Sequence, residues 1–397
     1  MAGTAAGDPT RHRYVTPHST GGAVRQPNLS PAPPAHNAAS PHFVLPIPPR
    51  ERAHGVNDRT GDASAPGRRT LIARAPARLD FGGGWTDVPP YADECGGFVC
   101  NVAITRHATA VLRSGVPEDP RAAAPETALA RAALRRAMRT HPPDDSAAPT
   151  LTLTADFPVG AGLGGSSAAG AAAVGALAAW RGEAPSPRAL AERSRAIEVE
   201  DLGIAGGWQD HLAAAHGGAL GISFGGQMVA RRLAVSTATL EALPACALVI
   251  YTGQSRISAT TITAVLDAYR DRVPAVVDAL AQLATLARAM AVALEADDLA
   301  TLGALVGEHW QHQRRLHPAI TTAQIDAIVA RAAAAGAWGA KALGASGGGS
   351  VLVMGPPERR TDLVAALDGL GELLPWSVDV QGFTVVDDHT LPPPADR

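Results

Sequence analysis

The chain has 397 residues, which is enough for two domains and a full-sized hydrophobic core. With 46% hydrophobic and 18% charged residues it has an ordinary globular composition, and a formal net charge of −3 excludes a general basic field that would attract nucleic acid or acidic lipid. The three cysteines, Cys95, Cys100 and Cys246, form no CxxC pair, so neither a disulfide framework nor a zinc site is expected.

Residues 1–68 are predicted to be a disordered N-terminal extension. Pro, Ala, His, Ser and Arg dominate the segment, and it has no apolar periodicity with which to offset the entropy of ordering. An Arg-rich, acid-poor start also fits a transit peptide. The segment lacks the continuous apolar run of a signal peptide, and unpaired cysteines suit a reducing compartment. We therefore expect a cytoplasmic protein that contacts neither nucleic acid nor membrane.

The folded part is predicted to begin at residue 69. Its first half mixes strands with helices, and the elements expected in chain order are a strand ending at Gly82, two short strands within 96–115, a helix over 125–140, a strand over 150–158, a helix near 186–200 and a hairpin over 217–233. A change of pattern near residue 240 predicts a boundary between two lobes, 69–240 and 241–397.

The second half is predicted to begin with a buried strand, "CALVIYTG", followed by long Ala- and Leu-rich helices over 259–336. A glycine run, "GASGGGS", and a closing strand, "SVLVMG", come after them. Because strands stand both before and between helices without a strict βαβ repeat, the fold class expected is α+β.

The stretch "PVGAGLGGSSAAGAAAVGAL" over 158–177 predicts a strand, a glycine loop and a helix. Its apolar residues are Ala and Gly, which disfavours a membrane span, and periodic structure on both sides disfavours a linker. Glycines admit backbone N–H groups to an anion, and a helix N-terminus favours negative charge. Taken alone, the loop fits phosphate binding and tight helix–strand packing equally well. It is neither a Walker A loop nor a GxGxxG opening a leading βαβ unit.

Three motifs together resemble those of the GHMP kinases. The loop above resembles the second motif, "APARLDFGGGWTD" over 75–87 the first, and "GAKALGASGGGSVLVM" over 339–354 the third. The resemblance implies the two-lobed GHMP kinase fold, with a ribosomal-S5-like N-terminal lobe that binds ATP and a ferredoxin-like α/β-plait C-terminal lobe. It also implies ATP and Mg²⁺ as cofactors, a small sugar or sugar phosphate as partner, and a possible homodimer.

Two branches of that family share further features with the chain. "GGGWTDVPPY" and "GGWQD" are most similar to the kinase domain of L-fucokinases, whereas "IEVEDLG", "QDHLAAAHGGALGISF" and the C-terminal region resemble heptose 7-phosphate kinases. Both branches phosphorylate the anomeric hydroxyl of a sugar. The chain has no room for a fused nucleotidylyltransferase, which favours a heptose 7-phosphate kinase. The alternatives are an L-fucokinase-type sugar 1-kinase and a non-catalytic homologue that binds sugar or ATP.

The sequence departs from the usual family pattern at three places. Ala345-Ser346 replaces part of the third motif's glycine pattern, Ser350 stands where Gly or Cys is common, and His211 makes "QDH" of the usual "QDQ". These departures concern the substrate more than the fold.

The resemblance assigns ATP to the second motif. The residues expected to bind it are Gly160, Gly162, Leu163, Gly164, Gly165, Ser166 and Ser167. Ser166 and Glu198 are expected to hold the metal, since Mg²⁺ prefers oxygen ligands. Glu200 and Asp201 are close alternatives to Glu198, and at helical spacing positions 198 and 200 point to different faces. The serines could also cap the helix that follows.

The same resemblance assigns the chemistry and the sugar. Asp210 is expected to be the catalytic carboxylate, with a loop cap as the alternative, and Arg78 to lie near the transferred phosphate. The residues expected to bind substrate are Trp85, Asp87, Gly348 between Gly347 and Gly349, and Arg256 for a substrate phosphate. Asp87 could instead only cap a turn. Lys341, the only lysine, could neutralise a phosphate or stand at the C-terminal end of a helix.

Overall fold

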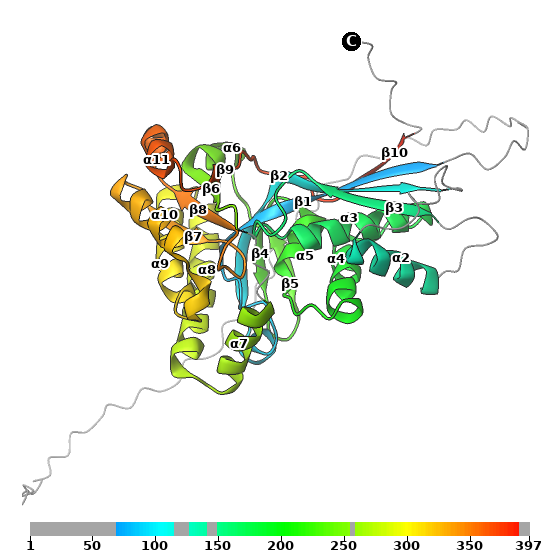
Figure 1. Ribbon diagram of the computed structural model, residues 1–397, viewed down its shortest axis with the longest axis horizontal. Coiled ribbons are helices and arrows are strands. Elements are labelled where there is room, and N and C mark those ends of the chain that lie inside the picture. The colour runs from blue at the N-terminus through cyan, green and yellow to red at the C-terminus, as the bar shows by residue number, and fades with distance from the viewer. Residues whose placement is uncertain (1–68, 115–126, 141–148, 255–258, 389–397) are drawn as a thin grey trace, which may run out of the picture. The chain divides into compact units, whose positions relative to one another are not determined.

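A computed structural model of the protein describes residues 69–114, 127–140, 149–254 and 259–388. The predicted extension, 1–68, and Arg256 lie outside these ranges. All described residues fall within one unit of the chain, Ala63–Arg397. The predicted α+β class is confirmed, because two antiparallel sheets are each covered by helices (Figure 1).

The first sheet has the strand order β10-β1-β2-β4-β5, with β3 paired to β2. Its strands are β1 Thr70–Gly82, β2 Phe98–Arg113, β3 Thr150–Ala155, β4 Ala219–Ser223, β5 Val229–Arg232 and β10 Thr384–Asp387. The prediction of two short strands within 96–115 is wrong, because β2 is continuous over 16 residues. The register shifts where Pro76 pairs with His107 and Ala77 with Ile104. At this β-bulge Thr105 and Arg106 have no partner on β1, and the strand continues past them.

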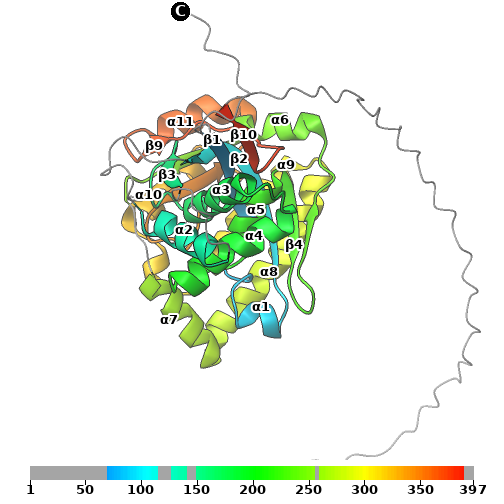
Figure 2. The same ribbon diagram turned by 90° about the vertical axis from the view of Figure 1, so that its right-hand side faces the viewer.

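Helices cover one side of this sheet (Figure 2). They are α2 Ala128–Thr140, α3 Gly165–Trp180, α4 Pro187–Ala196 and α5 Gln209–His216, and a short α1, Tyr91–Glu94, follows the first glycine loop. The α3 helix packs on β1 and β2 and consists mostly of buried small residues, which let it approach the sheet closely. The helix expected near 186–200 is present as α4, which continues directly into a π-helical turn over Ile197–Asp201.

The second sheet has the order β7-β8-β6-β9. Its strands are β6 Ala247–Tyr251, β7 Gly339–Ala342, β8 Ser350–Met354 and β9 Glu372–Leu373. The helices around it are α6 Thr237–Cys246, α7 Ala259–Arg270, α8 Pro274–Glu295, α9 Leu299–Gln313, α10 Ala323–Ala334 and α11 Arg360–Leu367, with 3-10 turns at Pro318–Ile320 and Pro357–Arg359.

The strand β8 does not close the fold, contrary to the prediction. The chain continues through α11 and β9 to β10, which pairs with β1 in the first sheet. We propose that the lobes follow the two sheets, 69–240 and 241–397, with β10 returning to the first.

A buried cluster joins the two sheets. Leu79 and Phe81 of β1 belong to the same apolar cluster as Met290 of α8 and Leu352 and Met354 of β8, and all five are buried. The end of β1 is therefore fixed against the second sheet, and the loops that follow β1, precede α3 and connect β7 to β8 lie at this junction.

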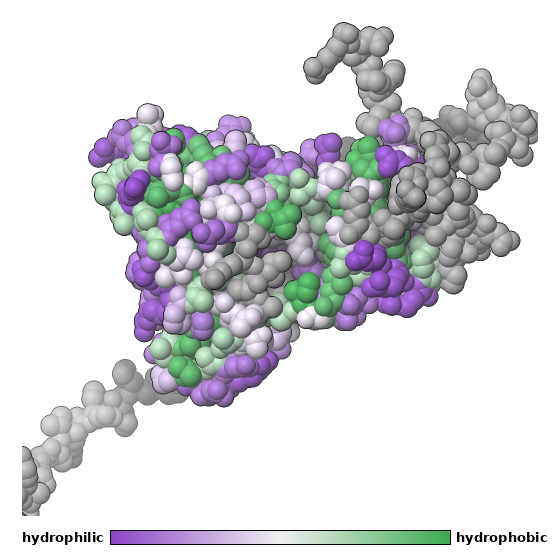
Figure 3. All heavy atoms as spheres, viewed as in Figure 1, coloured by the Kyte–Doolittle hydropathy of each residue, from purple (hydrophilic) through white to green (hydrophobic). Residues whose placement is uncertain are grey.

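The α8 helix is long and apolar enough to cross a membrane by composition alone, but half of its most apolar window is buried inside the fold. Its buried residues, such as Leu283 and Met290, contribute to the core clusters. It is a core helix. Figure 3 shows hydrophilic and hydrophobic residues intermingled on the face it displays.

Candidate functional site

A buried arginine on β1 connects the glycine loop before α3 to α5. Arg78, on β1, is 3% exposed, and its Nε donates to Oδ1 of Asp210 across 2.7 Å. Its Nη1 donates to the carbonyl of Gly162 at 2.7 Å, and its backbone N–H donates to the carbonyl of Leu163 at 3.0 Å. Asp210 lies in the first turn of α5 and its side chain is 27% exposed. One guanidinium thus fixes a partly accessible carboxylate beside the glycine loop.

The glycine loop leads directly into α3. Gly160, Gly162 and Gly164 have φ values of 77°, 74° and 74°, in the left-handed region that favours glycine. Gly164 is the N-cap of α3, and no side chain accepts a hydrogen bond there. The alternative in which Ser166 caps the helix is therefore wrong. The first amides of α3 can instead face an anion, and a Cβ atom at Gly164 would lie 3.1 Å from the carboxyl carbon of Asp210.

Two of the predicted ATP-binding residues are engaged in packing. Leu163 is 1% exposed and belongs to the cluster between the sheets. A Cβ atom at Gly165 would lie 2.5 Å from the ring of Phe157. Close helix–strand packing, which the sequence left open beside phosphate binding, is thus present at these two positions.

Glu198 faces the start of α3 from the π-helical turn. It is 6% exposed, Ser167 Oγ donates to its Oε2 at 3.2 Å, and Nε2 of His211 lies 3.1 Å from the same oxygen. Burial alone raises the pKa of Glu198, but hydrogen bonds from His211, Ser166 and Ser167 outweigh it and hold the pKa below its usual value. A carboxylate beside two hydroxyl groups suits a hard divalent cation.

The two neighbouring carboxylates are engaged elsewhere. Glu200 pairs with Arg136 at 2.7 Å, and Asp201 pairs with Arg136 at 2.8 Å and with Arg139 at 2.9 Å. Glu198 is therefore the acidic residue of this turn that faces α3. In the ranges that the structure describes, there is no group of three or more His, Cys, Asp or Glu side chains that could hold a metal ion.

Asp87 and Trp85 lie on the loop that follows β1. Oδ2 of Asp87 accepts hydrogen bonds from the amides of Trp208 at 2.8 Å and Gln209 at 3.1 Å, at the start of α5. Asp87 thus accepts hydrogen bonds from the first amides of a distant helix, which differs from the local turn cap that was its alternative interpretation. Burial, aided by the charges of Asp210 and Asp80 and opposed by the two amides, raises the pKa of Asp87 to about 6. Trp85 is 8% exposed with a φ of 81°, a strained conformation of the kind found at functional sites.

The third glycine run packs against the second. A Cβ atom at Gly349 would lie 3.2 Å from the Ala161 carbonyl, and one at Gly162 would lie 2.8 Å from the Leu343 carbonyl. The amide of Gly347 donates to the Ile320 carbonyl at 2.9 Å. Gly348, the predicted substrate-binding residue, is buried between Gly347 and Gly349. The two loops therefore share one junction, without space for side chains at these close contacts.

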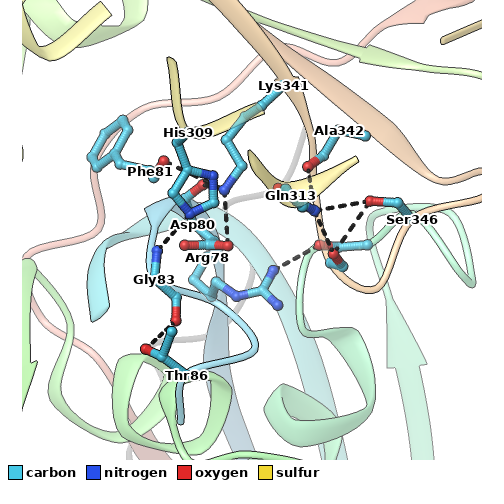
Figure 4. A network of polar contacts seen from close by, with 12 residues as sticks. Arg78, Asp80, Phe81, Gly83, Thr86, His309, Gln313, Lys341, Ala342 and Ser346 are labelled. Atoms are coloured by element: carbon cyan, nitrogen blue, oxygen red, sulfur yellow. Dashed lines mark hydrogen bonds and ion pairs between the residues drawn. The ribbon is translucent and has the colours of Figure 1, made fainter. Parts of the chain in front are cut away.

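Lys341 fits neither of its predicted roles. It lies on β7 with a fully buried side chain, and Nζ donates to Oδ2 and the carbonyl of Asp80, both at 3.0 Å, and to the carbonyl of Phe81 at 3.4 Å (Figure 4). It is neither at a helix C-terminus nor open to a phosphate. Asp80, 2% exposed, was missed because nothing local distinguishes it within a strand.

Arg195 is a second residue that the sequence motifs did not indicate. Its guanidinium lies 4.3 Å from the centroid of the Trp208 ring, and Nε and Nη2 donate to the carbonyls of Gly207 and Gly206, each at 3.2 Å. Burial lowers the pKa of Arg195, while the charge of Asp87 opposes this. Among the described residues no carboxylate forms an ion pair with it. The sequence signal that could have indicated Arg195 is its position three residues before Glu198, because this spacing places both side chains on one face of a helix.

Family models match two parts of the chain. Residues 128–218 match the GHMP kinases N terminal domain, and residues 290–372 match the GHMP kinases C terminal model. The first match contains α3, Glu198 and Asp210. The second contains Lys341 and the third glycine run.

Curated relatives are similar at low identity. The chain is 26% identical to the D-glycero-alpha-D-manno-heptose 7-phosphate kinase of Campylobacter jejuni over 75% of this chain and 93% of that protein. It is 27% identical to the bifunctional fucokinase/GDP-fucose pyrophosphorylase of Arabidopsis thaliana over 72% of this chain, but spans only 30% of that protein's length. It is also 27% identical to the L-fucokinase/L-fucose-1-P guanylyltransferase of Bacteroides fragilis, over 64% of this chain and 31% of that protein.

Solved structures share the fold. A D-glycero-D-manno-heptose 1-phosphate kinase from Bacteroides thetaiotaomicron superposes with a TM-score of 0.63 at 22% identity, over 80% of this chain and 98% of that one. The galactokinase of Lactococcus lactis, solved with galactose, superposes with a TM-score of 0.62 at 13% identity, over 79% and 95% of the two chains. The predicted two-lobed architecture is confirmed by these matches.

Proposed function

This chain belongs to the GHMP kinase family, and we propose on that premise that it transfers the γ-phosphoryl group of ATP to the anomeric hydroxyl of a sugar. The acceptor we propose is a heptose 7-phosphate. The observation that carries the proposal is the contact between Arg78 and Asp210 at the N-terminus of α3. It places a fixed carboxylate beside a loop suited to phosphate, as phosphoryl transfer to an alcohol requires.

Asp210 is the proposed catalytic residue. Its carboxylate, held at Oδ1 by Arg78, would accept the proton of the anomeric hydroxyl as the sugar oxygen bonds to the γ-phosphorus and the bond to ADP breaks. Arg78 also donates to Gly162 of the phosphate loop, so it ties the position of the base to that of the phosphates. Its permanent positive charge would stabilise the negative charge that spreads over the transferred group.

Glu198, Ser166 and Ser167 are the residues that fit Mg²⁺. The ionised, buried carboxylate and the hydroxyl groups supply hard oxygen ligands at the first turn of α3. When bound, Mg²⁺ neutralises phosphate charge and orients the terminal phosphates for in-line transfer. His211 and Ser167 hold the carboxylate in place, and the uncapped amides of α3 would bind the phosphates.

Two observations support a phosphorylated sugar as the acceptor, the position of Arg195 and the similarity to the Campylobacter jejuni relative. Arg195 stacks on Trp208, two residues before Asp210, and has no carboxylate partner among the described residues, so a substrate phosphate could be its counter-ion. Asp87 and Trp85 would bind the sugar hydroxyls and ring, with Gly348 at the opposite loop. The Campylobacter jejuni relative, named for a heptose 7-phosphate, is matched over 93% of its length.

A coupled ADP-release assay tests the proposal. Full-length protein with MgATP would be offered L-fucose, D-arabinose, galactose, mannose, sedoheptulose 7-phosphate and D-glycero-D-manno-heptose 7-phosphate, with Asp210→Asn as the control. Turnover of the heptose phosphate alone, lost in the variant, is the expected result. Turnover of L-fucose alone would identify the fucokinase-type alternative. ATP binding without turnover of any sugar would favour a non-catalytic homologue.

A further inference from the structure

Side chains from the second sheet and its helices hold the backbone where β1 becomes the first glycine loop. Lys341 of β7 contacts the carbonyls of Asp80 and Phe81, and Nε2 of His309, on α9, accepts the amide of Gly83 at 2.9 Å. Thr86 donates to the Gly83 carbonyl at 2.7 Å and so closes the turn that follows (Figure 4). Trp85 and Asp87 extend from this held segment.

We propose that Lys341, paired with Asp80 and aided by His309, is a positioning residue that fixes the sugar-binding loop, residues 82–87, relative to the third glycine run. This inference rests on the sugar-kinase function proposed above. Lys341 lies on β7, which leads directly into the third glycine run. Its side chain therefore links that run to the sugar-binding loop, residues 82–87.

All three N–H donors of the Lys341 ammonium group are used in these contacts. An ammonium has three N–H donors, and its acceptors are Oδ2 of Asp80 and the carbonyls of Asp80 and Phe81. The side chain is 0% exposed and that of Asp80 is 3% exposed. Burial lowers the pKa of Lys341 below its usual value, and the Asp80 carboxylate opposes this. No donor is left over for a phosphate.

The Asp80 carboxylate transmits this constraint to the catalytic side. A Cβ atom at Gly84 would lie 2.5 Å from Oδ2 of Asp80 and 3.0 Å from Nε2 of Gln209, so the loop backbone lies against both side chains. Gln209 precedes Asp210 in α5. The carboxylate is therefore enclosed between the sugar-binding loop and the helix that carries the proposed base.

A contribution to the stability of the fold does not by itself explain why this position holds a buried ion pair. Well-packed apolar residues commonly replace a buried ion pair without loss of stability, because removing two charges from water is costly. Arg231 on β5 and Glu295 on α8 form another ion pair between the two halves, at 2.5 Å, but it is partly exposed and lies outside the glycine loops. That pair provides a matched control.

The test compares the wild type with a double variant, Asp80→Asn with Lys341→Met, which removes both charges of the buried pair. Arg231→Met with Glu295→Gln is the control. Hydrogen–deuterium exchange over 82–90 and the KM values for sugar and ATP are measured on full-length protein. We expect exchange in 82–90 to rise, kcat/KM for the sugar to fall about 100-fold, and the KM for ATP to stay within about threefold in the double variant only.

Two results would overturn the inference. One is a folded double variant with wild-type exchange over 82–90 and an unchanged KM for the sugar. The other is an equal rise in both KM values, which would indicate a general loss of structure. If the double variant does not fold, His309→Leu removes the acceptor of the Gly83 amide without leaving a charge, and the same changes are expected at smaller size. If the wild type turns over no sugar, the proposed function fails and the exchange measurement alone decides the inference.

Discussion

His211 connects Glu198 to the helix that carries Asp210. Its Nε2 lies 3.1 Å from Oε2 of Glu198, and its Nδ1 lies 2.9 Å from Oγ of Ser194. Ser194 in turn donates to the Ser167 carbonyl at 3.3 Å. All of these side chains are buried. The histidine that departs from the usual sequence of this motif thus orients the carboxylate proposed to bind the metal.

Replacing His211 by Leu should lower the affinity for the metal more than it lowers the stability of the nucleotide-free protein. The imidazole fixes the orientation of Glu198, and loss of a residue that orients a metal ligand costs about 10- to 100-fold in metal affinity. Titration of Mn²⁺ in the presence of ADP, followed by electron paramagnetic resonance, measures this directly. His211→Gln, which keeps a donor, should retain more affinity than His211→Leu. Equal affinity in the two variants would contradict an orienting role.

The proposed metal ligand, Glu198, is tested by a pair of isosteric variants. Glu198→Gln should raise the Mg²⁺ concentration needed for half-maximal activity and lower kcat, because a neutral amide is a weaker ligand than a carboxylate. Glu200→Gln is the matched control, because Glu200 is exposed and pairs with Arg136. It should change the Mg²⁺ dependence by less than about twofold, as expected for a surface ion pair. A larger effect at Glu200 than at Glu198 would reverse the assignment.

Asp210→Asn should lower the rate of turnover by several orders of magnitude while leaving ATP bound. The amide cannot accept the hydroxyl proton, and loss of a general base costs about 10²- to 10⁴-fold in rate. Arg78→Met should also lower kcat, and it should destabilise the chain because Arg78 holds both Asp210 and the Gly162 carbonyl from a buried position. Single-turnover kinetics with thermal denaturation separates the two effects. Wild-type kcat in Asp210→Asn would remove Asp210 from the mechanism.

Local patterns were sufficient to predict the glycine loops and the residues around them. Strand, glycine run and helix are adjacent in sequence, so the start of α3 and the serines there could be placed from the order of residues alone. Helical spacing also indicated correctly that Glu198 and Glu200 point to different faces, since Glu200 pairs with Arg136.

Contacts between distant segments could not be predicted in the same way. Lys341 and Asp80 are 261 positions apart, and only the packing of β7 beside the end of β1 reveals that the lysine is buried. The bulge that keeps β2 continuous depends on the register with β1, which no window of β2 contains. The contacts that Glu198 makes with Ser167 and His211, in two other helices, likewise appear only once the segments pack together.

Asp87 should make the stability of the protein depend on pH. Its folded pKa of about 6 lies above its ordinary value of 3.8, so the folded state binds more protons than the unfolded state between these values. Stability from this group is therefore complete below about pH 3.8, falls as the pH rises through that window, and is lost above about pH 6. The proposed hydrogen bond from a sugar hydroxyl to this carboxylate is stronger when the carboxylate is ionised, so the KM for the sugar should rise as the pH falls below about 6.

Asp87→Asn separates these two effects. The amide oxygen can still accept the Trp208 and Gln209 N–H groups, but it carries no charge to bury. At pH 8 the variant should be more stable than the wild type by up to about 3 kcal/mol, from about 1.4 kcal/mol per pKa unit, and the difference should vanish near pH 4. Urea unfolding at pH 4, 6 and 8 measures it, with the exposed Asp93→Asn as the control. Because the variant also loses the charged acceptor, its sugar KM should be high and independent of pH. A variant that is less stable at pH 8 would show that the carboxylate's contacts outweigh the cost of burying its charge.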